Sequence, residues 1–470
     1  MGTVYDWAPG SGSVVSWHAS PASLAKARQA PVSAVPVGYM QSQHLRGFRE
    51  FADRGLDYSR LVMGRWDRPG RCDIRAMSYV INSHLRRHDT YRSWFECQDS
   101  GNIVRRTIAD PADIKFVPTK HGEMTPTEWH DLILGTPDPL QWDCFSFGII
   151  QHADYFTVYV VVDHLHTDPM LLALLYMEIF VNYGALTAGA APASLPPAGS
   201  YDEYCIRQHQ RTSALTSDSP QVRKWIEFAE NNGGTLPDFP LPLGDYSVPC
   251  GGDIVSDNLM DKEQTARFEA ICTQAGARFS GGLFACAALA QYELTGADTY
   301  YGLTPFDQRK SPTDYMTTGW FTGIVPFTVP VDPMSFAATA RAAQESFDAN
   351  RDLALVPFDR VLELAPWLRR PGPNFAMLNY MDAGLPPLSA VVASQLDGAN
   401  AATYCDGRTP AHVYMSVGRL FDEASMAVSF PNNPVARESA IRYLETMKSV
   451  CGRVAEGQAA TTPQRNVVLT

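Results

Sequence analysis

Two short apolar runs joined by a polar turn dominate the pattern of the first half of the chain. Residues 145–150 and 156–162 are apolar almost throughout, and the segment QHADY separates them. β-Branched residues on both faces of the second run are typical of a central, buried strand, so the pattern predicts a β-hairpin. The next run, 170–181, is apolar nearly all round, with Glu178 as its one charge, and predicts a buried helix.

The second half of the chain alternates helical and extended patterns. Helices are predicted at 264–276, 281–294 and 435–454, the last opened by Pro434, whose missing N–H costs little there. Strands are predicted at 299–303, 324–329, 375–381 and 427–430. Because helices and strands mix in both halves, the predicted fold class is α/β or α+β.

Two segments rich in Pro and Gly punctuate the middle of the chain. They cover 187–200 and 232–253, and a helical pattern over 201–228 lies between them. Such segments are typical of linkers between domains. We therefore expect an N-terminal lobe at 1–186, a linker with a helix at 187–245, and a C-terminal lobe at 246–470.

The composition is that of a folded, acidic protein. The chain has 470 residues, of which 45% are hydrophobic and 19% charged, with a net charge of −12. A dedicated nucleic-acid binder needs clustered Lys and Arg to neutralise phosphates, so the net charge argues against that class. Within 46–92, however, eleven Arg stand against six acidic residues. This local excess is either a solvated face with weak ion pairs or a patch that attracts coenzyme A or an acidic carrier protein.

Signals for secretion and membrane insertion are not recognisable. The N-terminus MGTVYDWAPG lacks the basic and apolar regions of a signal peptide. The apolar runs 156–162 and 170–181 are shorter than the ~20 residues that span a bilayer. The nine Cys form no CxxC pair, so neither a disulfide framework nor a zinc ribbon is indicated. We expect a cytoplasmic protein with no transmembrane segment, or one that is peripheral at the inner face of the membrane.

Ionisable residues gather where the predicted strand ends, over 163–169 (DHLHTDP). Polar groups in an apolar setting are costly unless they are paired. In one interpretation, His164 is a general base, a role that a neutral imidazole performs well near pH 7, and Asp168 pairs with an Arg.

Two other interpretations of this segment remain open. The HxHxD spacing of His164, His166 and Asp168 is compatible with a metal site, but Pro169 stands where such runs carry a further His ligand. In the third interpretation, His164 is a core histidine beside the start of a helix. Two His and two Asp within six residues of apolar sequence favour chemistry over packing.

Other reaction classes lack their motifs. The sequence holds no GxSxG elbow, no GxxxxGK[ST] loop and no GxGxxG fingerprint. A serine hydrolase of that type, a nucleotide-driven enzyme and a nicotinamide enzyme are therefore disfavoured.

The segment 163–169 resembles the HHxxxDG signature of the condensation-domain superfamily, which includes chloramphenicol acetyltransferase-like enzymes. His164 matches the second His of the signature and Asp168 its Asp. Other landmarks of that superfamily occur in the same order: PVGYMQ at 36–41, RHDTYRSWF at 87–95, GLTPFDQR at 302–309, GWFTGIVPFTVPV at 319–331 and VPFDRVLEL at 356–364.

Closer still, the chain resembles the mycobacterial polyketide-associated acyltransferases, in the branch that acylates trehalose. Segments typical of that branch include WHASP, AKARQAP, GRCDIRAM, PLQWDCF, FPLPLGD and GARFSGG. The resemblance implies two chloramphenicol acetyltransferase-like lobes that form a pseudo-dimer, with a substrate tunnel at their interface.

The resemblance also implies an activity. A long-chain fatty acyl group such as palmitoyl would pass from acyl-CoA or a carrier thioester to hydroxyls of trehalose, giving mono- and diacyltrehalose of the polyacyltrehalose type. His164 would be the catalytic base, with acyl-CoA as co-substrate and without a metal or other cofactor, and a polyketide synthase is an expected contact. The alternatives are a sulfolipid-type trehalose-sulfate acyltransferase, an amide-forming condensation enzyme, and a degenerate fold used as a scaffold.

The matched motifs further imply structural residues. Asp168 is expected to form an ion pair with Arg309 that supports the site without taking part in the chemistry. Asp163 stands where the signature has its first His, and we expect this position to be structural. Pro169 replaces the signature Gly and Gly323 the Asn of the GxFxN element, so neither is expected to supply an oxyanion donor.

Substrate contacts are the last group of expectations. His166 would share the side of His164 if the strand continued through it, and is a candidate on that ground. The other candidates for lining the substrate tunnel are Trp320, Phe321 and Thr322. For the two aromatic residues, packing in the core is the alternative.

Overall fold

The computed structural model of the chain describes residues 2–98, 101–245, 250–384, 389, 398–420 and 422–458. By spatial proximity the chain divides into two units, which are described separately. The first unit comprises Met1–Ser213, Arg309–Phe321 and Pro386–Gly407, and the second comprises Ala214–Gln308, Thr322–Leu385 and Arg408–Thr470.

The first unit therefore includes two segments from the part of the sequence in which we predict the C-terminal lobe. Residue 246, where that predicted lobe begins, lies outside the described residues. The predicted lobe boundaries and the tunnel expected between the lobes stay predictions.

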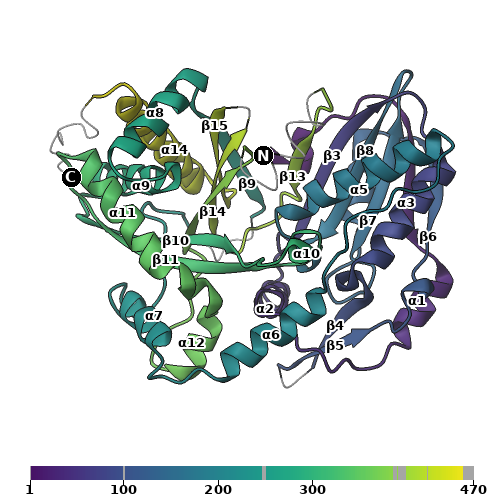
Figure 1. Cartoon of the computed structure of the whole chain (residues 1–470), viewed down its shortest axis with the longest axis horizontal. Coiled ribbons are helices and arrows are strands. Elements are labelled where there is room, and N and C mark those ends of the chain that lie inside the picture. Colours follow the sequence, from purple (N-terminus) through teal and green to yellow (C-terminus); the bar gives the residue numbers. More distant parts are fainter. Residues whose placement is uncertain are drawn as a thin grey trace. The chain divides into compact units, whose positions relative to one another are not determined.

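A seven-stranded sheet forms the centre of the first unit (Figure 1). Its strands, in spatial order, are β1 (Gly2–Thr3), β13 (Ala402–Cys405), β3 (Leu61–Pro69), β8 (Tyr155–Asp163), β7 (Phe145–Gln151), β2 (Ser13–Ala19) and β6 (Phe116–Glu123). Strands β7 and β8 are antiparallel, with Ile149 opposite Val158, so the predicted hairpin is confirmed. A separate two-stranded sheet pairs β4 (Ser93–Cys97) with β5 (Ile103–Thr107).

Helices cover both faces of this sheet because β8 is apolar on both sides. Val160 and Val162 belong to a core cluster that also holds Leu171 and Leu175 of α5. Tyr159, on the other face, packs in a cluster with Trp129 of α4. The helices of this unit are α1 (Pro21–Arg28), α2 (Tyr39–Asp53), α3 (Ile74–Arg87), α4 (Pro126–Leu134), α5 (Met170–Thr187), α6 (Tyr201–Ser213) and α10 (Pro312–Tyr315).

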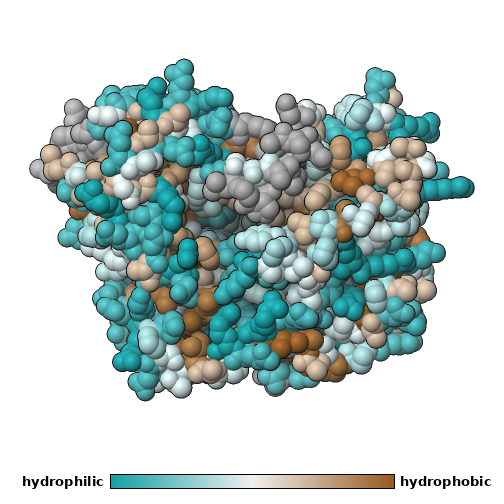
Figure 2. Space-filling view, in the orientation of Figure 1, coloured by the Kyte–Doolittle hydropathy of each residue, from teal (hydrophilic) through white to brown (hydrophobic). Residues whose placement is uncertain are grey.

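Helix α5 is the buried helix predicted at 170–181, and it extends farther, to Thr187. Its 18 residues are long and apolar enough for a membrane span by length and composition alone, and half of that stretch is buried. Helix α5 lies with α3 across one face of the sheet (Figure 1). The hydrophobic residues visible in Figure 2 form small separate patches among hydrophilic ones. The packing of α5 is that of a core helix.

The second unit is built around a four-stranded sheet in the order β12 (Ala376–Asp382), β14 (Val413–Leu420), β15 (Glu423–Pro431) and β9 (Gly252–Met260). Strands β10 (Thr299–Asp307) and β11 (Thr322–Pro330) form an antiparallel pair. The helices are α7 (Pro220–Glu230), α8 (Lys262–Gln274), α9 (Phe279–Thr295), α11 (Phe336–Asn350), α12 (Phe358–Leu364) and α14 (Pro434–Ala455). These elements confirm the helices and strands predicted for the second half of the chain.

The helical pattern predicted as one stretch over 201–228 is two helices, α6 and α7. Helix α6 belongs to the first unit and α7 to the second. The break falls before Pro220, which lacks the backbone N–H that a continuing helix would use and instead occupies the first turn of α7.

Candidate active site

The predicted site begins where β8 ends. The backbone N–H of Asp163 donates to Cys144 O at 2.9 Å, which completes the strand pairing. The side chain of Asp163 then accepts from the N–H of Leu165 at 3.0 Å and caps a 3-10 turn over His164–His166. The strand therefore does not continue through His166, and the expectation that His166 shares the side of His164 along a strand is wrong, because the Asp163 cap turns the chain first.

Asp163 is completely buried and lies between two basic side chains. His44 of α2 donates from Nε2 to Oδ1 at 2.8 Å, and Arg60 donates from Nη1 to Oδ2 at 2.9 Å. Burial alone would raise the pKa of Asp163, but His44 and Arg60 outweigh it and hold this pKa below its ordinary value. The carboxylate that replaces the first His of the signature is thus a charged anchor.

Arg60 connects this anchor to the surrounding backbone. Its guanidinium donates to Pro137 O at 2.9 Å and to Thr136 O at 2.6 Å. Its own carbonyl accepts the backbone N–H of His164 at 2.7 Å. The backbone of His164 is therefore held by the same residue that neutralises Asp163.

The ring of His164 is the candidate proton acceptor of the site. Its side chain is half-buried, and its Nδ1 is a buried atom with no hydrogen-bond partner among the described residues. The indole of Trp320 lies against it, with ring centroids 4.1 Å apart. Burial, followed by the electrostatic effect of His44, lowers the pKa of His164 to about 4. The ring is therefore neutral near pH 7, the form that accepts a proton.

His166 occupies a different environment from His164. It is only 1% exposed, and its Nδ1 lies 3.0 Å from Thr90 Oγ1. Its Nε2, like Nδ1 of His164, is buried without a hydrogen-bond partner among the described residues. The rings of Tyr91 and Phe145 pack around it. Burial lowers its pKa to about 4. The structure places His166 in the core of the first unit, and its contact with substrate stays a prediction.

Asp168 and Arg309 form the expected ion pair. Arg309 donates from Nη1 to Asp168 Oδ2 at 2.7 Å and from Nη2 to Oδ1 at 3.1 Å, and both side chains are almost completely buried. The same carboxylate accepts from the N–H of Met170 at 3.0 Å, at the start of α5. A bidentate pair of this kind fixes geometry as well as charge. Its role as a structural element stays a prediction.

This ion pair brings a distant segment to His164. Phe321 N–H donates to Asp168 Oδ2 at 3.0 Å, and the guanidinium of Arg309 lies 4.3 Å from the Phe321 ring centroid. Trp320, the preceding residue, is thereby placed against His164. Phe321 is completely buried, whereas Thr322 is half-buried and begins β11 in the second unit.

Gly323 and Pro169, the two other positions at which the chain departs from the family pattern, lie in different surroundings. A Cβ atom at Gly323 would lie 2.1 Å from both Ala354 O and Gln308 Nε2, so an asparagine does not fit there. Pro169 is exposed, and the N–H of the next residue is used by Asp168. At Gly323 the close approach of the backbone explains the residue type.

One group of side chains among the described residues has the proximity of a metal site: His84, His88 and Glu178. Its atoms are instead joined by hydrogen bonds, with His84 Nδ1 2.8 Å and His88 Nε2 3.1 Å from Glu178 oxygens. Arg87 Nε also lies 2.9 Å from this carboxylate, where a second cation would be repelled. The HxHxD residues do not converge, because His166 faces Thr90 and Asp168 faces Arg309.

The sequence reasoning missed His44 and Arg60, the two partners of Asp163. His44 lies three residues beyond Gln41, and Gln41 Nε2 itself donates to Leu165 O at 3.0 Å. The available signal was Asp163 itself, because a buried carboxylate requires a basic partner. Only the pairing of β3 with β8, with Leu61 opposite Asp163, identifies Arg60 as that partner.

Comparisons with known proteins agree with this geometry. Residues 36–381 match the profile of the condensation domain. Acyltransferase PapA3 of Mycobacterium tuberculosis is 55% identical over 97% of this chain and 97% of its own length. The 2'-acyl-2-O-sulfo-trehalose (hydroxy)phthioceranyltransferase PapA1 of Mycobacterium bovis is 57% identical over 98% of this chain and 89% of its own length.

Trehalose-2-sulfate acyltransferase PapA2 of Mycobacterium tuberculosis is 54% identical over 98% of both chains. A solved structure of PapA2 superimposes with a TM-score of 0.93 over 97% of this chain and 99% of that chain. These matches confirm the predicted fold class and resemblance. The chain belongs to the condensation-domain family and, within it, to the mycobacterial Pap acyltransferases.

Proposed function

We propose that this enzyme transfers a long-chain acyl group, such as palmitoyl, from acyl-CoA or a carrier thioester to a hydroxyl of trehalose. The observation that carries the proposal is the ring of His164, half-buried and with its pKa lowered to about 4, at the position of the second His of the family signature. A neutral imidazole in this state can accept the proton of an attacking alcohol.

The reaction follows from that role. A ring nitrogen of His164 removes the hydroxyl proton as the sugar oxygen attacks the thioester carbonyl carbon, forming the new C–O bond. The tetrahedral intermediate then collapses with cleavage of the C–S bond, and the leaving thiolate takes the proton back from His164. Because both substrates are held together, no acyl-enzyme is required, and orientation supplies much of the acceleration.

The identity of the acceptor has two candidates. The relatives PapA1 and PapA2 carry names that specify sulfated trehalose, whereas the name of PapA3 specifies no acceptor. Unsulfated trehalose, giving mono- and diacyltrehalose, is the acceptor that we propose. Trehalose-2-sulfate is the second candidate, supported by the names of PapA1 and PapA2.

The donor, the partners and the compartment complete the proposal. A polyketide synthase is the expected source of a carrier-bound acyl chain. All nine cysteines are free thiols in the structure, which is compatible with the reducing cytoplasm. Peripheral association with the inner face of the membrane is part of the same proposal, since the products carry acyl chains.

An acceptor panel tests the proposal. The purified enzyme is incubated with palmitoyl-CoA and either trehalose, trehalose-2-sulfate or an amine, and products are identified by mass spectrometry. Acyltrehalose formed by the wild type and lost in His164→Ala is the expected result. Acylation of trehalose-2-sulfate alone would select the second candidate, and acylation of the amine alone would overturn ester formation.

A further inference from the structure

Residues 317–321, here called the strap, carry Trp320 to the ring of His164. Contacts from two site residues hold the ends of the strap. Arg309 Nη2 donates to the first carbonyl oxygen of the strap at 3.1 Å, and Asp168 Oδ2 accepts its last N–H at 3.0 Å. The position of Trp320 therefore depends on how the strap is held between these ends.

The middle of the strap is held by His88, a residue that the mechanism does not use. The N–H of Thr318 donates to His88 Nδ1 at 3.3 Å, and His88 is completely buried. The other ring nitrogen, Nε2, lies 3.1 Å from Glu178 Oε1. Because a carboxylate can only accept, the proton of the neutral ring is on Nε2, and Nδ1 is free to accept from Thr318.

Glu178 of α5 keeps His88 in this state. Burial would raise the pKa of Glu178, but the hydrogen bonds from His84 and His88 outweigh it and hold the pKa well below its usual range. Arg87 adds an ion pair at 2.9 Å. A charged Glu178 requires a donor from His88, which fixes the orientation of that ring.

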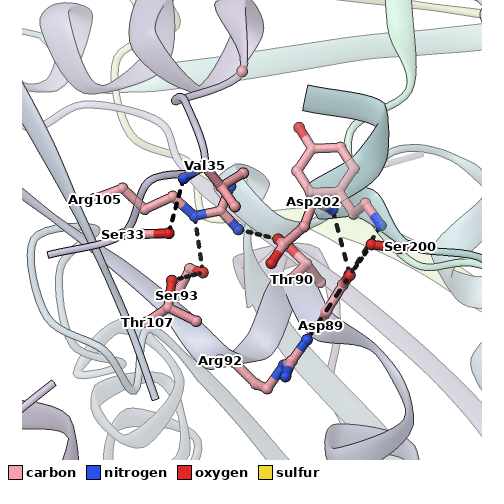
Figure 3. Close-up of polar contacts among 12 residues, drawn as sticks. Ser33, Val35, Asp89, Thr90, Arg92, Ser93, Arg105, Thr107, Ser200 and Asp202 are labelled. Carbon is pink, nitrogen blue, oxygen red and sulfur yellow. Dashed lines mark hydrogen bonds and ion pairs between the residues drawn. The ribbon is translucent and has the colours of Figure 1, made fainter. Parts of the chain in front are cut away.

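The residue after His88 supports the strap from another side. Asp89 accepts from Ser200 Oγ and, at 2.9 Å, from the N–H of Tyr201, at the start of α6 (Figure 3). The ring of Tyr201 lies so close to the strap that a Cβ at Gly319 would be 2.4 Å from it. Tyr201 OH also donates to Trp320 O at 3.4 Å.

Additional contacts hold α6 in place. Figure 3 shows Arg105 reaching Asp202 of α6 and Ser93 Oγ at the start of β4, the second at 2.9 Å. Ser93 in turn bonds Thr107 of β5, with the two hydroxyl oxygens 3.0 Å apart. Helix α6, which backs the strap, is therefore anchored to the two-stranded sheet, and His88 accepts the backbone N–H of Thr318 in the middle of the strap.

We propose that His88 is a positioning residue for acyl transfer, which holds the strap so that Trp320 covers the ring of His164. This proposal rests on the proposed function of His164. Without an acceptor at His88 Nδ1, the buried N–H of Thr318 has no partner, and the strap moves to find one. Trp320 then leaves the ring of His164, and the base loses both its orientation and its shielding from water.

Two substitutions separate the two hydrogen bonds of His88. The amide oxygen of asparagine reaches the place of Nδ1, so His88→Asn retains the acceptor for Thr318 and loses the contact with Glu178. The longer glutamine reaches the place of Nε2, so His88→Gln retains the contact with Glu178 and loses the acceptor. Thermal unfolding of both variants establishes that each one is folded.

The kinetic test compares kcat and KM for these two variants. We expect His88→Gln to lower kcat between about tenfold and a hundredfold, with the KM for acyl-CoA within about twofold of the wild type. His88→Asn should remain within about threefold of the wild-type kcat. Equal losses in both variants, in proportion to their thermal stability, would mean a general packing role and would overturn the proposal.

A second readout is independent of any substrate. The charged groups that act on the pKa of His164 are His44, Asp163 and Asp168, and Trp320 of the strap packs against its ring. In NMR spectra of protein labelled at histidine, with His164→Ala for assignment, the pKa of His164 should rise toward 6.5 in His88→Gln and stay near the wild-type value in His88→Asn. An unchanged His164 titration in both variants would also overturn the positioning role. If the wild type acylates no trehalose acceptor while this titration still responds, the proposed function fails and the positioning role stands.

Discussion

Among the described residues of the first unit, two groups that combine histidines with a carboxylate differ in whether their ring nitrogens have hydrogen-bond partners. In the group of His84, His88 and Glu178, all four ring nitrogens have partners at 2.8–3.3 Å. In the group of Asp163 and His164, the carboxylate accepts hydrogen bonds from His44 and Arg60, whereas Nδ1 of His164 is buried without a hydrogen-bond partner among the described residues.

The difference lies in what each carboxylate requires of the imidazoles around it. Both groups pair imidazoles with a carboxylate whose pKa is lowered. In the group of His84, His88 and Glu178, here called the closed group, both nitrogens of each ring are used in structural hydrogen bonds. In the group of Asp163 and His164, here called the open group, His44 and Arg60 supply the hydrogen bonds that the Asp163 carboxylate requires. His164 is therefore not needed as its partner. Whether an imidazole is committed to a structural hydrogen bond thus depends on its neighbours and not on residue type.

The largest effect should come from removing the imidazole ring of His164. His164→Ala should lower the rate of acyl transfer by ~10²–10⁴-fold, the usual contribution of a general base, while the protein stays folded. Product formation from palmitoyl-CoA measures the rate, and circular dichroism measures the fold. His152→Ala, at the opposite end of the β7–β8 hairpin, is the matched control and should retain activity. Near-normal activity of His164→Ala would refute the assignment.

The next effect concerns the carboxylate beside the open group. Asp168→Ala should lower the free energy of unfolding by about 3–5 kcal/mol, because the buried guanidinium of Arg309 loses the carboxylate that balances its charge. Urea denaturation measures this loss, and the double variant with Arg309→Met should recover part of it. A stable Asp168→Ala that is only inactive would show that Asp168 is catalytic and not structural.

A smaller effect is expected from the closed group. Glu178→Gln keeps the size of the side chain and removes the charge that accepts from His84 and His88. It should lower the free energy of unfolding by about 1–3 kcal/mol, measured by urea denaturation. Acyl transfer should fall by less than in His164→Ala, because the base itself remains. A larger loss of activity than in His164→Ala would contradict the distinction between the two groups.

The last prediction concerns the dependence of stability on pH. The pKa values of His164 and His166 in the folded protein are lowered to about 4. Between pH 6.5 and 4 the unfolded chain therefore binds more protons at these two histidines than the folded protein does. Stability should be complete above pH 6.5 and fall as the pH drops from 6.5 toward 4. Urea midpoints across this window measure the fall, and His164→Ala should make it shallower. Constant midpoints between pH 6.5 and 4.5 would contradict the lowered pKa values.

Much of the fold could be predicted because its signals are local. The apolar runs on either side of QHADY became β7 and β8, and the runs of small or amphipathic residues became α8 and α9. The failure at 201–228 is also local, since Pro220 marked a break that the periodicity did not reveal. The turn after β8 could not be predicted from the strand pattern, because the cap by Asp163 is a side-chain contact that overrides this pattern.

The sequence alone determined the identity of the chemistry: the residue types of 163–169, the matched motifs and the candidate base His164. Only the tertiary structure decided which of these side chains form hydrogen bonds or ion pairs with other residues. Arg60, the strap and His88 reach the site from segments far apart in the chain, through sheet pairing and packing. Hydrogen bonds and burial act over a few ångströms in space, and a linear pattern carries no record of those distances.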